Sequence, residues 1–450
     1  MSILVPSTLP APHAPEDADA SDTAPPSDSA RTRRDLAAFV ADGVAFSIMV
    51  GCGETYLPAF LLALGLGPVT VALMATVPTI IGAAVQLGVP VVARSIGSHR
   101  LVVLICTSLQ ALSFVPLAFW AWTGRAHPAA LFAVVSLYWA AGMATSPAWT
   151  AWIGSIVPAS VRTAFFAGRN RLAQAGVLVG FVAGGLLLEA GRRTGSQLPM
   201  FAALFCLAAG ARLLSTLFLA TCAERLPAWI QTRSTTHSPT AASIPPHGSA
   251  LSNGRYVSML AYLWVVTFSA HFAAPFFTPY MLQELQFSYG TYMVVVATSL
   301  AAKSLALRRL GRLASRIGSV GLLSVGGISL LPLSLLWLVS PSPAWLVTVQ
   351  IVAGVCWAAY ELAVCLLFFD EVEQADRAAV TSAYTFGLAC ATVAGASVGG
   401  LLLASLGEDR AAYLAVFAGS SLLRLATVPL LMVFRGRSRH GRRRTPDAII

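Results

Sequence analysis

Glu54, His271, Lys303 and Glu361 are ionisable side chains that lie inside long apolar runs of this 450-residue chain. A charged side chain at the centre of a bilayer costs roughly 2.5–3.5 kcal/mol, so such a residue usually faces a cavity or a charged partner. Removal from water favours the neutral form of a carboxylate, which lets it take up and release a proton near neutral pH. Glu54 and Glu361 are therefore candidate proton-coupling or cation-binding groups.

The other two ionisable residues have different chemistry. His271 could change protonation in the working pH range, and Lys303, the only lysine, could neutralise an anionic substrate or pair with Glu361. Structural alternatives stay open: bonding of either carboxylate to a neighbouring helix, packing of His271, and extension of Lys303 to the inner surface. Aromatic residues of the same runs could stack an amphipathic substrate or simply pack the core; those singled out are Tyr56, Trp149 and Tyr360.

The runs that hold these residues have the length and composition of transmembrane helices. The chain is 56% hydrophobic and 11% charged, whereas a soluble protein carries about 25% charged residues. Its mean hydropathy is +0.73. Backbone groups in lipid must bond internally, so runs of this kind are helical. We expect an all-α membrane protein with twelve transmembrane helices at about 37–64, 69–92, 101–122, 128–152, 173–190, 198–222, 256–282, 289–307, 320–340, 344–369, 380–404 and 412–434.

The sequence also repeats itself. ARSIGS at 93–98 reappears as ASRIGS at 314–319, and GGLLL at 184–188 reappears at 399–403. Many secondary transporters consist of two such halves with the transport site between them. The expected organisation is a disordered tail, a six-helix half, a linker, a second six-helix half and a basic tail, at 1–35, 36–222, 223–254, 255–434 and 435–450.

Basic residues collect on one side of the predicted topology. Of the 29 Lys and Arg residues, three lie within spans, and the loops on one side hold only Arg125, Arg192, Arg193 and Arg410. The positive-inside rule then places both termini in the cytoplasm. The net charge of +10 reflects this topology, so we expect a lipid bilayer and no nucleic acid as partner. The bias to Arg is typical of a GC-rich bacterial genome, and we expect a monomer in the inner membrane.

Twelve spans in two halves with a polar central loop resemble the major facilitator superfamily. That family carries a G-x-L-A-D-R-x-G-x-R-R pattern in the loops between spans 2 and 3 and between spans 8 and 9. Here 311–319 reads GRLASRIGS, with Ser315 at the acidic position, and the first copy has Arg94 there. The stretches at 53–67 and 146–171 resemble a bacterial subgroup of the family with no assigned substrate.

The resemblance implies roles for further residues. Spans 1, 4, 7 and 10 would line a central cavity. A cytoplasmic gate or loop motif would include Arg94, Gly97, Arg100, Gly311, Arg316, Gly318, Asp370 and Arg377, although the same charges could serve topology alone. Small residues allow close helix contact. Spans 5 and 11 could therefore move against the opposite half during alternating access, or the same residues could serve static helix packing alone. The glycines concerned are Gly176, Gly180, Gly184, Gly185, Gly399 and Gly400.

We therefore expect a secondary transporter of a small organic solute, working by alternating access and driven by protons. Efflux is favoured over uptake by symport, because GVLVGFVAGG at 176–185 is similar to an antiporter pattern, with Phe181 at its proline position. An intramembrane enzyme is disfavoured, since HExxH is absent, and the chain has no Walker GxxxxGK[ST] sequence. We expect no cofactor and no metal. A transporter-like sensor or scaffold is an alternative, because the loop acids and the arginine of span 4 found in many proton-coupled members are missing.

Overall fold

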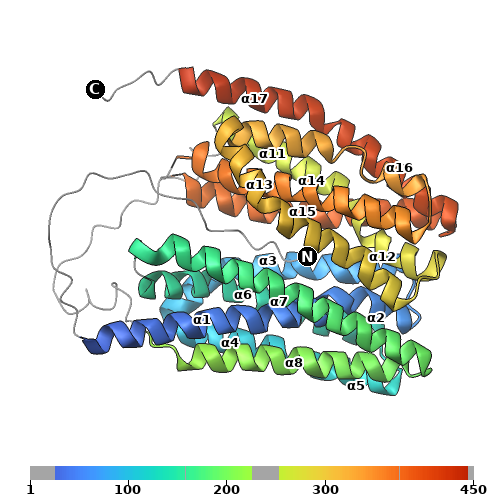
Figure 1. Ribbon diagram of the computed structural model, residues 1–450, viewed down its shortest axis with the longest axis horizontal. Helices are drawn as coiled ribbons and strands as arrows, with labels where there is room; N and C mark the ends of the chain where they lie inside the picture. The colour runs from blue at the N-terminus through green and yellow to red at the C-terminus, as the bar shows by residue number, and fades with distance from the viewer. Residues whose placement is uncertain (1–25, 158, 225–252, 374–375, 444–450) are drawn as a thin grey trace. The chain divides into compact units, whose positions relative to one another are not determined.

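The computed structural model describes residues 26–157, 159–224, 253–373 and 376–443, and every secondary-structure element in these ranges is a helix (Figure 1). The expected tails and linker lie largely outside the described residues. Elements of the first sequence half are α1 (Pro26–Cys52), η1 (Glu54–Tyr56), α2 (Leu57–Ala63), α3 (Pro68–Ile96), α4 (His99–Leu112), α5 (Phe114–Thr123), α6 (Pro128–Ile156), α7 (Ala159–Arg193) and α8 (Gln197–Thr221). Those of the second are α11 (Gly254–His271), η3 (Ala274–Phe276), α12 (Phe277–Pro279), η4 (Tyr280–Glu284), α13 (Tyr289–Ser329), η5 (Leu335–Leu338), α14 (Pro343–Asp370), α15 (Arg377–Ser405), α16 (Arg410–Leu425) and α17 (Thr427–Arg443).

Among the described residues, eleven helical segments are long and apolar enough to cross a membrane. They account for the twelve expected spans, because the 41 residues of α13 include the span at 289–307 and the first part of the span at 320–340. At about 1.5 Å per residue it would be roughly 60 Å long, twice the hydrocarbon thickness of about 30 Å. Gly318 within it has φ 75° and ψ 171°, which is not helical, so two helices meet there. The all-α fold class is confirmed.

Backbone irregularities recur at matching positions of the two sequence halves. Gly97 and Gly318, the glycines of the repeated loop, have φ of 77° and 75°, a region that glycine enters without steric cost. Spans 1 and 7 are both interrupted by a 3₁₀ turn, at Glu54–Tyr56 and at Ala274–Phe276. The offset of about 221 residues therefore relates local geometry as well as sequence.

Spans 3 and 9 show a third correspondence. Ser113 separates α4 from α5, and Ser334 immediately precedes η5. In the second half, Arg424 Nη1 donates a 2.6 Å hydrogen bond to the carbonyl oxygen of Leu330, which ends α13. This bond satisfies a backbone acceptor that the broken helix leaves without an intrahelical donor.

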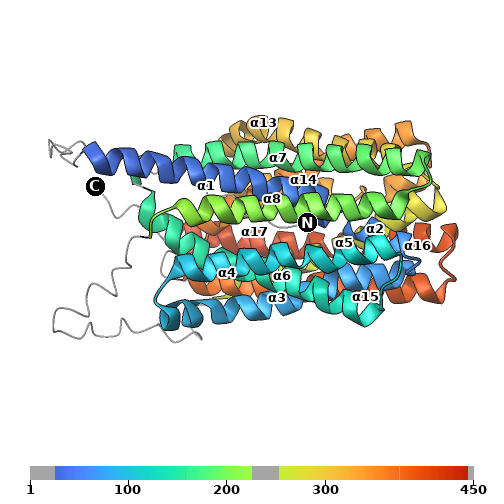
Figure 2. The same cartoon turned by 90° about the horizontal axis from the view of Figure 1, so that it is seen from below.

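Contacts group the chain into two compact units, the first comprising 1–56, 84–184 and 199–237 and the second 57–83, 185–198 and 238–450. Within the first unit, α1 lies beside α8 in both ribbon views (Figures 1 and 2). Its core includes Phe39 and Trp152, with ring centres 5.2 Å apart. The core of the second unit includes Tyr262 and Tyr360 from α11 and α14.

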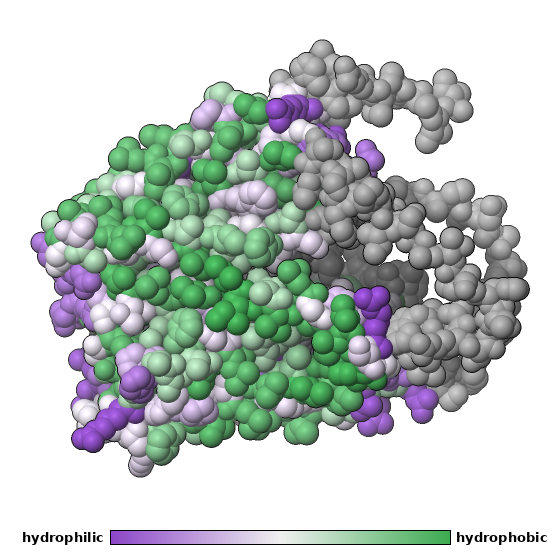
Figure 3. Space-filling model, turned by 180° about the vertical axis from the view of Figure 1, so that it is seen from behind, coloured by the Kyte–Doolittle hydropathy of each residue, from purple (hydrophilic) through white to green (hydrophobic). Residues whose placement is uncertain are grey.

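Large apolar side chains are exposed along the helices. Leu305, Trp122 and Leu401 are 79%, 71% and 69% exposed. Figure 3 shows apolar residues across the middle of one face, with hydrophilic residues gathered toward its ends. Apolar patches of this extent are typical of a surface that lipid covers. The protein is a multi-pass membrane protein.

Candidate functional site

Glu54 is bonded to a tyrosine of span 4 that the sequence did not single out. The Tyr138 hydroxyl, on α6, donates a 2.7 Å hydrogen bond to Glu54 Oε2 and lies 3.4 Å from Met49 Sδ. Tyr138 is fully buried and Glu54 is half-buried. A hydrogen bond to an ionised acceptor is stronger than one between neutral groups. The pair therefore stabilises the carboxylate within a largely apolar surrounding.

Glycines place Glu54 at the interruption of span 1. A Cβ at Gly51 would lie 2.2 Å from the carbonyl oxygen of Val177, so only glycine allows this approach of α1 to α7. A Cβ at Gly53 would lie 2.8 Å from side chains of both α5 and α8. Because α1 ends at Cys52, the Glu54 side chain leaves from a 3₁₀ turn between two helical segments.

Tyr56 lies on the same turn and braces spans 1 and 5. Its hydroxyl donates a 2.7 Å hydrogen bond to the carbonyl oxygen of Phe181, and the two rings stack with centres 4.9 Å apart. Phe181 stands where the antiporter pattern has proline. The Tyr56 hydroxyl and ring are thus both engaged in helix packing.

A second polar group lies about three helical turns nearer the N-terminal end of span 1, at Asp42. Its Oδ1 accepts a 2.7 Å hydrogen bond from Ser215 Oγ, and its Oδ2 lies 3.3 Å from Arg169 Nη2. Arg212 Nη1 donates a 2.9 Å hydrogen bond to the same Ser215 oxygen. The Asp42 and Arg169 side chains are only 4% and 15% exposed. These charges are withdrawn from water and compensate one another.

Aromatic rings cover both arginines. The Arg169 guanidinium lies 4.5 Å from the centre of the Trp149 ring, and that of Arg212 lies 4.7 Å from Phe46. Such cation–π contacts gain strength when the cation is desolvated. Trp149, an expected substrate aromatic, therefore packs against the Asp42–Arg169 ion pair.

In the second unit, Lys303 Nζ forms an ion pair with Glu361 Oε2 between α13 and α14. The two side chains are 24% and 36% exposed. Gly354 brings the helices together here, since its Cβ would lie 2.4 Å from the carbonyl oxygen of Ser299. A partly exposed ion pair is weakly held, so a charged solute could compete for either member. The structure brings together these two expected residues.

His271 and Tyr360 occupy different surroundings. His271 ends α11, directly before the interruption of span 7, and its Nδ1 lies 3.0 Å from the Thr267 carbonyl oxygen. Within the described part of the chain, no hydrogen bond or ion pair joins His271 to Lys303. Tyr360 is buried, with its ring 5.8 Å from that of Trp357 in a T-shaped arrangement.

In the first copy of the repeated loop, an acidic residue from outside the loop accepts hydrogen bonds from the loop. The carboxylate of Glu224, just after α8, accepts hydrogen bonds of 2.6 Å from Ser98 Oγ and 3.1 Å from the Arg100 N–H. Arg100 Nη2 also donates to the Ala220 carbonyl oxygen at 2.5 Å. Arg94, at the family's acidic position, is exposed and bonds the carbonyl one turn before it. Glu224 therefore ties this loop to the end of α8.

The second copy of the loop has a different environment. Gly311 and Arg316 are exposed. Asp370 is exposed at the end of α14, whereas Glu371 is 2% exposed, accepts a 2.7 Å bond from a serine of α17 and lies 3.8 Å from an arginine of α11. Arg377 begins α15, and its side chain lies outside the described residues.

Glycines of spans 5 and 11 pack these spans onto the first helix of their own half. A Cβ at Gly180 would lie 2.4 Å from the Ile48 carbonyl oxygen, and one at Gly399 would lie 2.0 Å from that of Phe272. Gly176 faces the same part of α1. Backbone oxygens cannot rotate away as side chains do, so these contacts require glycine.

The neighbouring glycines have a second kind of contact. Gly185 lies against Met293, and Gly400 lies against Val69, with Cβ distances of 2.6 and 3.2 Å. Both contacts fall within the second unit and join segments from different halves of the sequence. Gly184 packs instead on the Tyr56 ring. In each span, the two adjacent glycines thus allow close contact with two different neighbouring segments.

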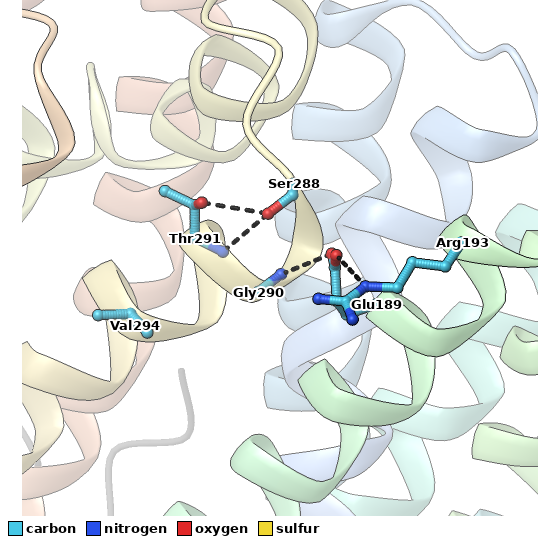
Figure 4. Close-up of a pocket in the computed structure, with 6 residues that line it drawn as sticks. All are labelled: Glu189, Arg193, Ser288, Gly290, Thr291 and Val294. Carbon is cyan, nitrogen blue, oxygen red and sulfur yellow. Dashed lines mark hydrogen bonds and ion pairs between the residues drawn. The ribbon is translucent and has the colours of Figure 1, made fainter.

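A polar contact joins the end of α7 to the start of α13 in the second unit (Figure 4). Glu189 Oε2 accepts a 3.2 Å hydrogen bond from the Gly290 N–H, and its carboxylate also bonds Arg192 at 2.9 Å and Arg193 at 3.2 Å. A pocket of about 320 Å³ lies beside it, lined by Glu189, Arg193, Ser288, Gly290, Thr291 and Val294. The N-terminal N–H groups of a helix favour an anionic partner.

Interrupted helices, two related six-span halves and charged pairs inside the spans define the class of secondary-transporter folds. A family model for the Major Facilitator Superfamily matches residues 36–360 and 259–449. The chain belongs to the major facilitator superfamily, and the expected fold of two six-helix halves is confirmed. Among curated proteins, no significant match was found.

Solved structures share the fold at low sequence identity. The nucleoside transporter NupG has a TM-score of 0.66 at 15% identity and covers 90% of this chain and 98% of its own. A D-xylose–proton symporter has 0.64 at 14%, covering 88% and 96%. A bacterial homologue of the human lysosomal transporter Spinster, in an inward-facing and unoccupied conformation, has 0.63 at 14%, covering 95% and 100%. At these identities the likeness shows the fold alone.

Proposed function

We propose that this protein moves a small organic solute across the bacterial inner membrane by alternating access, coupled to protons through Glu54, with both termini in the cytoplasm. The observation that carries this proposal is the half-buried Glu54 carboxylate held by the Tyr138 hydroxyl at the interruption of span 1. Interrupted spans are where many secondary transporters bind solutes and coupling ions. A carboxylate at this position can take up a proton and release it again.

The Lys303–Glu361 pair is the proposed solute-recognition site of the second half. The two charges neutralise each other while the ion pair is formed, and each side chain is partly exposed. An anionic group of the solute would compete with Glu361 for Lys303, and a cationic group would compete with Lys303 for Glu361. His271, at the interruption of span 7, is proposed as a second group whose protonation accompanies transport.

Efflux of an amphipathic solute is the proposed direction, and uptake by symport is the second candidate. Gly176, Gly180 and Gly184 of the antiporter-like stretch all pack on span 1, which supports a special role for this helix pair. Uptake is supported by one structural neighbour, which is a D-xylose–proton symporter. The two candidates differ in whether solute and proton move together or in opposite directions.

The test begins with ligands that raise the melting temperature of the purified protein, since binding to the folded state stabilises it by mass action. Nucleosides and pentoses form the first set, after two structural neighbours, followed by amphipathic cations and anions. Each ligand is then offered to proteoliposomes with and without a pH gradient. Gradient-dependent accumulation supports the proposal, and its direction separates efflux from uptake. A protein that binds ligands yet moves none of them under either condition is a sensor or scaffold.

A further inference from the structure

Four arginines form one charged face of α13, beyond the residue that pairs with Glu361. Counted from Leu305, they follow after three, four, seven and eleven residues, and these spacings place all of them on the same side of a helix. The helical geometry continues to Gly318, so the stretch from Leu305 to the last arginine is about 16 Å long. The members of this arginine face are Arg308, Arg309, Arg312 and Arg316.

The described residues supply no counter-charge to the arginine face. All four side chains are exposed, and their guanidinium groups take part in no hydrogen bond or ion pair within the described ranges. The sequence has no Asp or Glu between Glu284 and Glu361, and Glu361 pairs with Lys303. At the end of α14, Asp370 is exposed and Glu371 bonds a serine of α17. Like charges three or four residues apart destabilise a helix, so an anion bound at this face would stabilise it.

The same side of α13 is apolar on the other side of the arginines. Leu305 is 79% exposed, and Val294, eleven residues earlier and therefore on the same side, is 50% exposed. Arginine side chains near the end of a span extend to the level of the lipid headgroups. Guanidinium groups bind phosphate oxygens through paired N–H donors. An apolar stretch followed by cations matches a phospholipid with acyl chains and an anionic headgroup.

The first half of the sequence shows that the fold does not require arginines at these positions. The offset of 221 residues matches the arginine face with Leu87, Gly88, Val91 and Ser95. All four are exposed, and the two apolar ones are 60% and 57% exposed. Basic residues that only orient a span can lie anywhere near its end. Their alignment on one exposed helix side, in one half only, indicates a binding surface.

We propose that the arginine face binds the phosphate of an anionic phospholipid, whose acyl chains lie along Leu305 and Val294. The headgroup supplies the missing counter-charge, and each basic residue near an anionic membrane surface strengthens binding about fivefold. This lipid site is separate from the proposed Lys303–Glu361 solute site and does not depend on transport. It rests on the proposed topology only in assigning the lipid to the cytoplasmic leaflet.

The experiment measures lipid binding to the purified full-length protein by native mass spectrometry. Phosphatidylglycerol and phosphatidylcholine with identical acyl chains are titrated into detergent micelles, and the dissociation constant of the first bound lipid is obtained for each. We expect phosphatidylglycerol to bind about tenfold or more tightly than phosphatidylcholine, and an excess of inorganic phosphate not to displace it. Equal affinities would overturn the proposal, and displacement by inorganic phosphate would assign the face to a free anion instead of a lipid.

Paired substitutions locate the binding. Arg308→Gln combined with Arg312→Gln removes two of the four charges and should weaken phosphatidylglycerol binding about 20-fold, without changing phosphatidylcholine binding. The corresponding pair of Lys substitutions keeps the charges and should retain most of the affinity. The matched control combines Arg33→Gln with Arg34→Gln, which removes two exposed arginines near the start of α1 and should bind as wild type does. An equal loss in the control, or no loss in the test variant, would contradict the assignment.

An acidic segment near the start of the chain is the other candidate occupant. Its acids Glu16, Asp17, Asp19 and Asp22 lie outside the described residues. Replacing these four acids by Gln and Asn should leave phosphatidylglycerol binding unchanged. Tighter binding in that variant would show that the segment competes for the arginine face, and the lipid would no longer be its partner.

These outcomes are separate from those of the transport proposal. Lipid selectivity can be lost while ligands still raise the melting temperature and move across the membrane, or it can be present in a protein that transports nothing. If the first variant does not fold, Arg309→Gln combined with Arg316→Gln takes its place, with the same expected loss. The comparison of the two lipids on the wild-type protein decides even if neither variant folds.

Discussion

The contact between Gly180 and α1 allows the sharpest prediction about the scaffold that places Glu54. In Gly180→Ala the added Cβ would lie 2.4 Å from the Ile48 carbonyl oxygen, whereas ordinary contacts lie beyond 3.4 Å. The two helix backbones would have to separate by about 1 Å, and overpacking of this kind costs about 1–3 kcal/mol. Alanine regains up to about 1 kcal/mol through its higher helix propensity. We expect a net loss of about 1–2 kcal/mol in the free energy of unfolding.

Gly210→Ala is the matched control, because Gly210 lies within α8 and has nothing within 4 Å of the added Cβ. It should be neutral or stabilise the protein by up to about 1 kcal/mol. The measurement is reversible unfolding of each variant in mixed micelles of increasing SDS content. Gly399→Ala, with a 2.0 Å contact to the Phe272 carbonyl oxygen, should behave like Gly180→Ala. The packing argument is refuted if Gly180→Ala proves as stable as Gly210→Ala.

Three further predictions concern other parts of the chain. Lys303→Ala should weaken the binding of anionic ligands, measured as melting-temperature shifts, and leave neutral ligands unaffected, while Lys303→Arg retains anion binding; an equal loss for neutral ligands would indicate a structural role. Glu224→Ala removes the acceptor for Ser98 and Arg100 and should cost about 1–2 kcal/mol in SDS unfolding, whereas Glu373→Ala, an exposed acid, should be neutral. The Cys222 side chain is only 1% exposed, so maleimide cannot reach its thiol while the protein is folded. A protein whose only cysteine is Cys222 should therefore resist maleimide until SDS unfolds it, and rapid labelling of the folded form would contradict this.

The sequence was most informative where the backbone requirement was local. The repeated ARSIGS and ASRIGS loops place Gly97 and Gly318 221 residues apart, and both adopt the left-handed φ that glycine permits. Long apolar runs predicted the spans, because few structures other than a helix satisfy the backbone hydrogen bonds inside a bilayer. The breaks at Ser113 and Ser334 had no such signal, since serine is tolerated within transmembrane helices and tertiary packing decides where each helix ends.

The polar partners were harder to foresee, because they depend on which helices meet. Asp42 follows a cluster of arginines near the start of span 1, so the sequence alone suggests that it lies at the membrane surface. Its partner Arg169 lies 127 residues away. Tyr138 resembles any aromatic residue of a membrane helix until Glu54 is found beside it. The pairing of Lys303 with Glu361 could be named in advance, because few other charges were available at that depth.

The central claim is that Glu54 couples solute movement to protons, and one measurement tests it most directly. Proteoliposomes containing a pH-sensitive dye receive a compound that raises the melting temperature of the protein, and proton movement is recorded for wild type and Glu54→Gln. We predict compound-dependent proton movement in wild type and none in Glu54→Gln, although the variant still binds the compound. Equal proton movement in both proteins would contradict the account.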